Sequence, residues 1–358
     1  MTLIRHGLCF LIDVVRSLFT YSLLFFFIGF SGVAQDSLRT VTAEQGDGIL
    51  ALLRKNGVRP YEYYDDFIAL NIHNLRDSVH LYHGKEYRIP NMDVDSVQVV
   101  ETIQEQSKKV KEVKSDEFAI FGEKYKTVLE KSERLKGNVY YLVSGHGGPD
   151  PGAMAEYEGK SIAEDEYAYD ITLRLARELL THSATVYIIV RDEDDGIRDE
   201  RILQIDRDEV VYPDKTIPLN QLERLKQRVQ VVNDLYKENK GTYQRLVVTH
   251  VDSRSEGQNI DVFFYHHEKS KNGKKLAESI HKTFESKYKK YQPNRTYSGT
   301  FEDRTALYLV KKTHPAMTFI EIGNIKNKKD QIRILDPDNR QAMAKWISEG
   351  MLLDFEGE

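Results

Sequence analysis

Short apolar runs alternate with longer amphipathic stretches from Asn138 to the end of the chain. Near-continuous apolar strands that alternate with amphipathic helices are typical of a mostly parallel sheet covered by helices. In such a sheet the ligand crevice lies outside the carboxyl ends of the strands. The sequence therefore predicts an α/β fold with its chemistry at that edge. The expected strands are 139–143, 185–190, 245–249 and 317–322, and the longest expected helix is 162–180.

Composition narrows the class of protein. The 358 residues are 40% hydrophobic and 30% charged, which allows one large domain or two to three smaller ones. Lys and Arg total 51 against 56 Asp and Glu, and this near balance argues against a nucleic-acid binder. Cys9 is the only cysteine, which excludes a disulfide framework and a cysteine-built zinc site. A bound metal must therefore be held by His, Asp and Glu.

Residues 1–34 have the three parts of a secretory signal peptide. Arg5 and Arg16 precede an apolar run over 18–30, and small residues follow up to Ala34. The run is shorter than the roughly 20 residues that a membrane span needs. We expect cleavage after Ala34, with an uncleaved anchor helix as the alternative. Either way the remaining chain is expected to be exported, with no stable membrane insertion once the signal is removed.

Residues 38–91 predict a small α/β module. A short strand near 39–42 is followed by two helices, which end near Gly57 and Asn71, and by a closing strand over 84–90. This strand–helix–helix–strand order resembles a LysM domain. LysM domains bind glycans that contain N-acetylglucosamine, such as peptidoglycan, so the resemblance implies wall binding; a module without ligand affinity is the alternative. The matching residues are Val41, Gly46-Asp47, Leu50 to Leu53, Asn71, Gly84 and Ile89-Pro90.

Residues 92–136 predict a charged linker and a short packing segment. The chain is polar and charged up to about Glu117, as in a solvated linker or a frayed helix. An apolar set with helical spacing follows over 118–129, and we expect it to pack on the domain that comes next.

Four residues that can carry chemistry lie at the ends of the expected elements. The first strand runs into His146, which has glycines on both sides; later strands deliver His250 and Glu321. Glu164 lies at the start of the long helix, on the face of its apolar stripe, and Glu166 is its main rival there. Two imidazoles and one carboxylate suit zinc with one open position for water.

Residues 137–356 resemble the zinc-dependent N-acetylmuramoyl-L-alanine amidases of the cell-wall hydrolase type. The resemblance rests on His146-Gly147-Gly148-Pro149-Asp150-Pro151-Gly152-Ala153 and on Glu321-Ile322-Gly323 with Asn327. It implies that His146, Glu164 and His250 bind Zn²⁺ and that Glu321 is catalytic. Lesser matches are Arg191, Arg228, Asn233, Gly257, the strand 260–265, Leu276-Ala277 and Pro315-Ala316.

The chain departs from the family pattern at three places. Val143-Ser144 replaces an Asp-Pro pair, Val251 replaces an alanine, and residues 192–219 are longer and more charged than usual. That longer stretch could be a lid, a partner-docking loop or decoration. No long helical insertion lies between Tyr265 and Leu276, where autoinhibited relatives carry a regulatory helix. Activity is therefore expected to be constitutive or regulated by an outside partner, which the sequence does not identify.

The resemblance implies hydrolysis of the amide bond between N-acetylmuramic acid and L-alanine in peptidoglycan, in the periplasm or at the cell wall. The residues by themselves predict a zinc-dependent hydrolase of an amide-like bond. Two alternatives stay open: a non-catalytic peptidoglycan-binding scaffold and a zinc peptidase that acts on the stem peptide.

Overall fold

The computed structural model describes residues 39–45, 47–60, 63–75, 80–90, 114–252 and 260–357. The chain divides into two compact units, residues 1–101 and 102–358. The expected signal peptide and residues 92–113 of the expected linker lie outside the described residues. Within the described ranges, no helix combines the length and the apolar character that crossing a bilayer requires.

The small unit has the predicted strand–helix–helix–strand order. Strands β1 and β2 pair antiparallel, and the two helices contribute the buried side chains Leu53 and Phe67, of which the Phe67 ring lies 6.0 Å from the Tyr87 ring of β2. The Asn71 side chain donates to the carbonyl oxygens of Phe67 and Arg88, which ties the second helix to β2. The elements are β1 (Thr40–Thr42), α2 (Ile49–Lys55), α3 (Tyr64–Asn71), the 3-10 turn η1 (Ile72–Asn74) and β2 (Glu86–Arg88).

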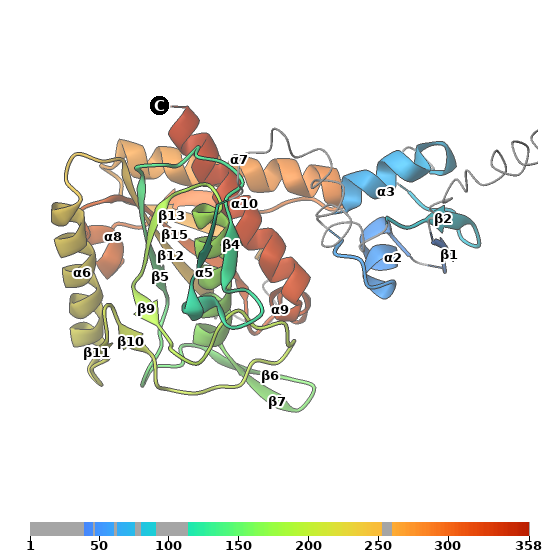
Figure 1. Ribbon diagram of the computed structural model, residues 1–358. Coiled ribbons are helices and arrows are strands. Elements are labelled where there is room, and N and C mark those ends of the chain that lie inside the picture. Colours follow the sequence, from blue (N-terminus) through green and yellow to red (C-terminus); the bar gives the residue numbers. More distant parts are fainter. Residues whose placement is uncertain are drawn as a thin grey trace, which may run out of the picture. The chain divides into compact units, whose positions relative to one another are not determined.

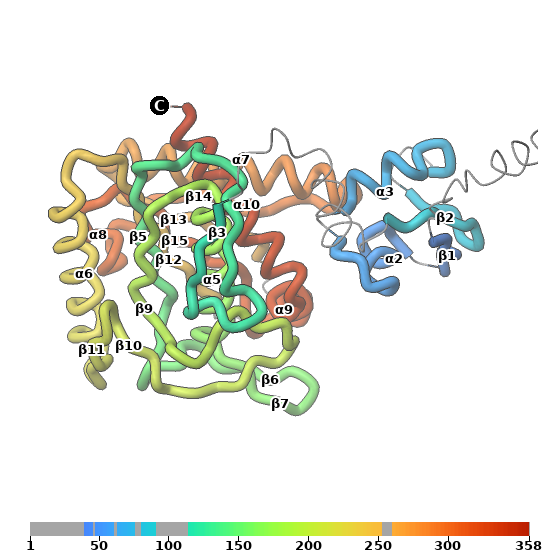
Figure 2. Tube along the Cα trace, viewed as in Figure 1, coloured from blue at the N-terminus to red at the C-terminus, as the bar shows by residue number. Residues whose placement is uncertain are grey.

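The large unit contains the predicted mostly parallel sheet. Its six strands, within the described residues, lie in the order β14-β13-β15-β12-β5-β8. Figure 1 labels β13, β15, β12 and β5 of this sheet, and Figure 2 adds β14. β8, β5, β12 and β15 run parallel, while β13 pairs antiparallel with β15. The strands are β5 (Val139–Ser144), β8 (Thr185–Ile188), β12 (Gln244–Asp252), β13 (Phe263–His266), β14 (Thr300–Asp303) and β15 (Ala316–Asn324).

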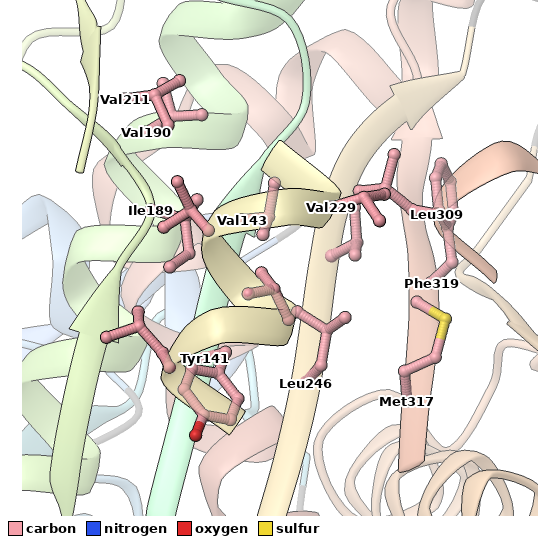
Figure 3. Close-up of a cluster of buried hydrophobic side chains, with 14 of the residues drawn as sticks. Tyr141, Val143, Ile189, Val190, Val211, Val229, Leu246, Leu309, Met317 and Phe319 are labelled. Carbon is pink, nitrogen blue, oxygen red and sulfur yellow. The ribbon is translucent and has the colours of Figure 1, made fainter. Parts of the chain in front are cut away.

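Helices cover both faces of this sheet. Successive strand residues point to opposite faces, so Val248 packs in the cluster with Val229 of α6, while Thr249 contacts Thr172 of α5. Figure 3 shows the cluster that contains Val248 and Val229. In this view Tyr141, Leu246 and Met317 of the strands lie below Val229 of α6. The helices are α5 (Glu164–Leu180), α6 (Gln221–Glu238), α7 (Lys271–Tyr291), α8 (Tyr308–Lys312), α9 (Lys328–Leu335) and α10 (Pro337–Glu356).

The expectation of a helix-like apolar face over 118–129 is wrong. The segment is a hairpin of β3 (Ser115–Glu117) and β4 (Thr127–Leu129) around a 3-10 turn at Ala119–Phe121. Gly122 leaves that turn at a φ of 75°, which helical residues do not adopt. The hairpin does pack on the large unit, because Arg177 of α5 donates to the carbonyl oxygens of Tyr125 and Thr127.

The expected strand 185–190 is divided in two. β8 stays in the main sheet, whereas β9 (Val190–Arg191) pairs with β10 (Val210–Val211), which in turn pairs with β11 (Lys215–Thr216). The charged residues 192–219 therefore supply two strands of a second small sheet. A further hairpin, β6 (Met154–Tyr157) and β7 (Lys160–Ala163), precedes α5, so that helix begins at Glu164 rather than at Ile162.

Candidate metal centre

His146, Glu164 and His250 come together at the carboxyl ends of β5 and β12. One donor atom from each side chain lies within 4.8 Å of the other two. Glu164 lies between the two histidines: its Oε2 is 3.3 Å from His146 Nε2, and its Oε1 is 2.9 Å from His250 Nδ1. Three residues that are far apart in the chain thus meet where the parallel-sheet rule locates a ligand crevice.

Glu164 is the first residue of α5, and backbone donors fix its carboxylate. The Ala153 N–H donates to Oε2 at 2.9 Å, and the Val251 N–H donates to Oε1 at 3.0 Å. The side chain is 6% exposed. Each carboxylate oxygen therefore keeps one backbone donor and turns its remaining lone pair toward a histidine.

His146 lies two residues beyond β5, in a turn that bends sharply. Its backbone has a φ of 60°, a left-handed value that few non-glycine residues adopt. Its Nδ1 is 3.1 Å from Asp150 Oδ2, and its carbonyl oxygen accepts a hydrogen bond from Arg228. A carboxylate on one imidazole nitrogen sets the tautomer and leaves the other nitrogen as a metal donor.

His250 lies within β12, and its ring is enclosed by close neighbours. It stacks on Phe319 with centroids 4.4 Å apart and meets the His146 ring edge-on at 4.9 Å. A Cβ on Gly145 would lie 2.4 Å from this ring, and one on Gly152 would lie 2.7 Å from the His146 ring. Glycine is required at both positions because any side chain would occupy the space of a histidine.

Glu321 lies on β15 directly opposite His250 in the parallel register. It shares the strand face of Phe319, two residues earlier, because side chains alternate along a strand. Both line an open cleft of about 510 Å³, together with His146, Glu164, His250 and Arg224. The fourth predicted residue thus lies beside the other three.

The charges within the cluster are strongly coupled. Burial acts to raise the pKa of Glu164, but hydrogen bonds from His146 and His250 outweigh it and hold that pKa well below its usual range. Burial acts to lower the pKa of His146, yet the carboxylates of Asp150 and Glu164 raise it to about 10. Burial lowers the pKa of His250. The site thus presents an ionised carboxylate, one histidine (His250) that favours the neutral, metal-binding form, and one (His146) whose proton a bound cation would displace.

Glu166 is not brought into this cluster. Its Oε2 pairs with Arg198 at 2.9 Å, and its Oε1 accepts the Asp206 N–H at 3.1 Å. Both partners belong to the charged stretch 192–219, which covers the side of α5 that carries Glu166.

Two residues of the site received no role from the sequence. Asp150 contacts His146 and binds Arg224 at 2.7 Å, and Phe319 supplies the stacking surface for His250. Asp150 follows His146 by four residues in a glycine-rich turn, which is the signal that could have identified it. Phe319 precedes Glu321 by two residues and so shares its strand face.

A second group of metal-capable side chains, also within the described residues, lies in the charged stretch. Oxygens of Asp192, Asp206 and Glu209 lie within 4.8 Å of one another, as do those of Asp192, Asp194 and Asp208. All these donors are carboxylates, which suit hard cations, whereas imidazole suits zinc. The His146, Glu164 and His250 cluster is therefore the better match to a zinc site.

Comparison with known proteins identifies the family. The family model described as N-acetylmuramoyl-L-alanine amidase matches residues 141–352. The germination-specific N-acetylmuramoyl-L-alanine amidase of Bacillus subtilis (strain 168) is 23% identical over 223 residues, which cover 62% of this chain and 81% of the relative.

Solved structures of low sequence identity are also similar. The CwlD amidase from Clostridioides difficile, in complex with the GerS lipoprotein, has a TM-score of 0.46 and 20% identity over 62% of this chain and 99% of that one. The catalytic domain of CwlV from Bacillus (Paenibacillus) polymyxa var. colistinus has a TM-score of 0.44 and 20% identity, with the same two shares. Because the family model spans more than half of the residues, the chain belongs to the N-acetylmuramoyl-L-alanine amidase family and is a peptidoglycan amidase.

Proposed function

We propose that this amidase is zinc-dependent, with His146, Glu164 and His250 as the zinc ligands and Glu321 as the catalytic base. The observation that carries the proposal is the convergence of the three donors within 4.8 Å, with Glu321 beside His250 in the strand register. Three protein donors with a fourth position left for water are the usual set of a catalytic zinc site.

The residues present fit zinc in their chemistry and in their surroundings. Glu164 and His250 are each held on a second side, by backbone N–H groups and by the Phe319 ring respectively. Asp150 Oδ2 lies 3.1 Å from Nδ1 of His146, and Nε2 of the same ring faces Glu164 as the donor atom. Outer partners of this kind are a usual feature of metal-binding histidines.

The reaction then divides between the metal and the chain. A bound zinc ion supplies Lewis acidity, which polarises an amide carbonyl and lowers the pKa of a water molecule. Glu321 takes the proton of the attacking water on a carboxylate oxygen and returns it to the nitrogen of the leaving amine. The cleft beside Glu321 is open, which suits a substrate as large as a peptidoglycan strand. By family membership, the bond cleaved is the one between the lactyl group of N-acetylmuramic acid and L-alanine.

The N-terminal parts of the chain extend the proposal. Residues 1–34 direct export to the periplasm or the cell wall, and the LysM-like residues 38–91 bind glycan and tether the enzyme to its substrate. Tethering raises the local concentration of substrate at the active site. Removal of 38–91 should therefore lower turnover on insoluble sacculi and leave turnover on soluble muropeptides unchanged. An equal loss on both substrates would contradict the tether.

Product analysis on purified peptidoglycan tests the reaction itself. Intact free stem peptides with bare glycan strands are the expected products, and cut stem peptides would instead indicate a zinc peptidase. Failure to release any product at any zinc loading would indicate a non-catalytic scaffold. Elemental analysis adds the ligand test: His146→Ala, Glu164→Ala and His250→Ala should each lose zinc, whereas Glu166→Ala should retain one zinc per chain.

A further inference from the structure

The sequence left the charged residues 192–219 as a lid, a partner-docking loop or decoration, and in the structure two parts of this stretch contact the turn that carries His146. Residues 209 and 217 pack on its glycines, and the end of the stretch holds Arg224, which binds Asp150.

The first contact is a buried carboxylate. Glu209 is 6% exposed, and its Oε2 accepts the Gly148 N–H at 2.6 Å. A Cβ on Gly148 would lie 3.0 Å from Ile217, and one on Gly147 would lie 3.5 Å from Glu209. The glycines after His146 thus let the stretch approach the turn closely, and Glu209 uses that approach to fix the backbone.

The second contact is a chain of polar contacts that runs from the end of the stretch through Arg224 and Asp150 to His146. Arg224 donates to the carbonyl oxygen of Leu219 at 2.5 Å and to that of Pro218 at 3.3 Å. The same guanidinium binds Asp150 Oδ2 at 2.7 Å, and that oxygen is 3.1 Å from His146 Nδ1. The position of the imidazole therefore depends on where residues 218 and 219 hold Arg224.

His146 needs such support because its backbone is strained. A non-glycine residue at a φ of 60° stays there only when its surroundings determine it from several sides. Gly147 contributes one local hydrogen bond, to the Asp150 carbonyl at 2.8 Å. Further contacts come from Glu209, Arg224 and Arg228, which all lie far along the chain from the turn.

We propose that the charged stretch 192–219 positions His146 for metal binding through two positioning residues: Glu209, which belongs to the stretch, and Arg224 of α6, which the end of the stretch holds. Neither residue donates to the metal. Glu209 holds the turn through the Gly148 N–H, and Arg224 holds the imidazole through Asp150. The inference rests on the proposed zinc site, since it assigns the stretch a role only if His146 is a ligand.

The test measures zinc affinity of the full chain by competition with a chelator, together with the unfolding midpoint of the zinc-free protein. Glu209→Ala and Arg224→Gln should each weaken zinc binding about 10- to 100-fold, the range typical for loss of a partner behind a metal ligand. Glu209→Gln keeps an oxygen that can accept the Gly148 N–H, so it should stay close to the unmodified protein. Glu200→Gln, at an exposed position in the same stretch, is the matched control and should have no effect.

His146→Ala separates the two proposals. If it leaves zinc affinity unchanged, the zinc site itself is wrong and the inference falls with it. If it abolishes binding while Glu209→Ala and Arg224→Gln bind zinc normally, the site stands and the positioning role is overturned. A lower unfolding midpoint with unchanged zinc affinity would likewise overturn it, because it would mean that the contacts only stabilise the fold. If Glu209→Ala does not fold, Arg224→Gln decides the question, since Arg224 lies on a helix outside the stretch.

Discussion

His250 lies within β12, which is hydrogen-bonded to β5 on one side and to β15 on the other. His146 lies beyond the end of β5, in a turn with a left-handed backbone. The first histidine is held within the β12–β15 pairing, whose register shifts just after it, and by Phe319 beside it; the second is held by Asp150 and by side chains that arrive from distant segments. Two side chains of the same proposed role are thus supported in opposite ways.

The difference teaches where the site can fail. The strand side of the site, formed by β12 and β15, carries the proposed ligand His250 and, opposite it, the proposed base Glu321. Substitutions there should therefore affect both metal binding and chemistry. The turn side, which is the turn after β5, carries only the proposed ligand His146, so substitutions there should act through zinc affinity.

The largest effect is expected for Glu321→Gln on the strand side. General base catalysis contributes about 10²- to 10⁴-fold, and turnover on peptidoglycan should fall by that factor. Zinc content should stay at one per chain, because Glu321 is proposed as a base and not as a ligand. Glu302→Gln, at an exposed position on the edge strand β14, is the control for the change of side chain. Loss of zinc together with activity would show that Glu321 belongs to the ligand set.

Two glycine substitutions crowd the two histidines separately. Gly145→Ala sets a methyl group 2.4 Å from the His250 ring, and Gly152→Ala sets one 2.7 Å from the His146 ring and 2.8 Å from Glu164 Oε2. Each should weaken zinc binding by at least about 10-fold, the lower end of what a disturbed ligand environment costs. Gly159→Ala controls for backbone strain in Gly152→Ala, because both glycines have a positive φ but a Cβ on Gly159 would meet no atom within 4 Å. Normal zinc affinity in Gly145→Ala would mean that His250 can move freely without loss of the site.

Asp170→Asn should weaken the attachment of the charged stretch 192–219 to α5, and this stretch contacts the turn of His146. Asp170 is completely buried; it binds Arg174 and Arg340 and accepts the Arg198 N–H, so it anchors the charged stretch to α5. Removing one partner of such a buried network costs about 3–5 kcal/mol in the free energy of unfolding. Urea denaturation at pH 7 measures this loss, with Asp234→Asn at a half-exposed site as the control.

The same carboxylate gives a pH dependence with a definite sign. Burial acts to raise the pKa of Asp170, but Arg340 and Arg174 outweigh it and lower the pKa below its ordinary value. Its contribution to stability is therefore complete above the unfolded pKa of about 3.9 and is lost as the pH falls through the lower folded value. The gap in stability between the unmodified protein and Asp170→Asn should be constant from pH 7 to about pH 5 and should narrow in stronger acid. A gap that widened in acid would contradict the assignment.

The smallest effect is expected for Glu166→Gln. Glu166 contacts Arg198 and Asp206 and makes no contact with either histidine in the described structure. Zinc stoichiometry and turnover should stay close to those of the unmodified protein, because Gln keeps an oxygen that can accept the Asp206 N–H and Arg198 keeps its pair with Asp195. The matched variant Glu164→Gln should lose zinc. The reverse outcome for these two glutamates would overturn the ligand assignment.

The strand side could be predicted from the sequence. Apolar runs end at His250 and Glu321, and parallel strands bring their carboxyl ends to one edge, so the two side chains had to lie close together. The observed register pairs them directly. The predicted elements of the small unit are also observed, because local periodicity and the glycine that ends the first helix were enough to locate them.

The turn side could be predicted only in part. The motif around His146 indicated the histidine, but its contacts with Glu209 and Arg224 span 61 and 74 residues and cross a charged stretch without periodicity. Helical spacing likewise failed over 118–129, where a glycine turn and hairpin pairing with β3 override it. The apolar stripe of α5 favoured Glu164 over Glu166, but 15 residues of that helix are buried, on nearly all sides. The contacts distinguish the two glutamates, because only Glu164 reaches the Ala153 and Val251 N–H groups.

The central claim is that two differently supported histidines and one glutamate form a single zinc site. Anomalous diffraction at the zinc absorption edge, from crystals of the protein grown with zinc, tests it most directly. The account predicts one strong peak about 2.0–2.2 Å from a nitrogen of His146, an oxygen of Glu164 and a nitrogen of His250. A peak among Asp192, Asp206 and Glu209, with none between the two histidines, would contradict it.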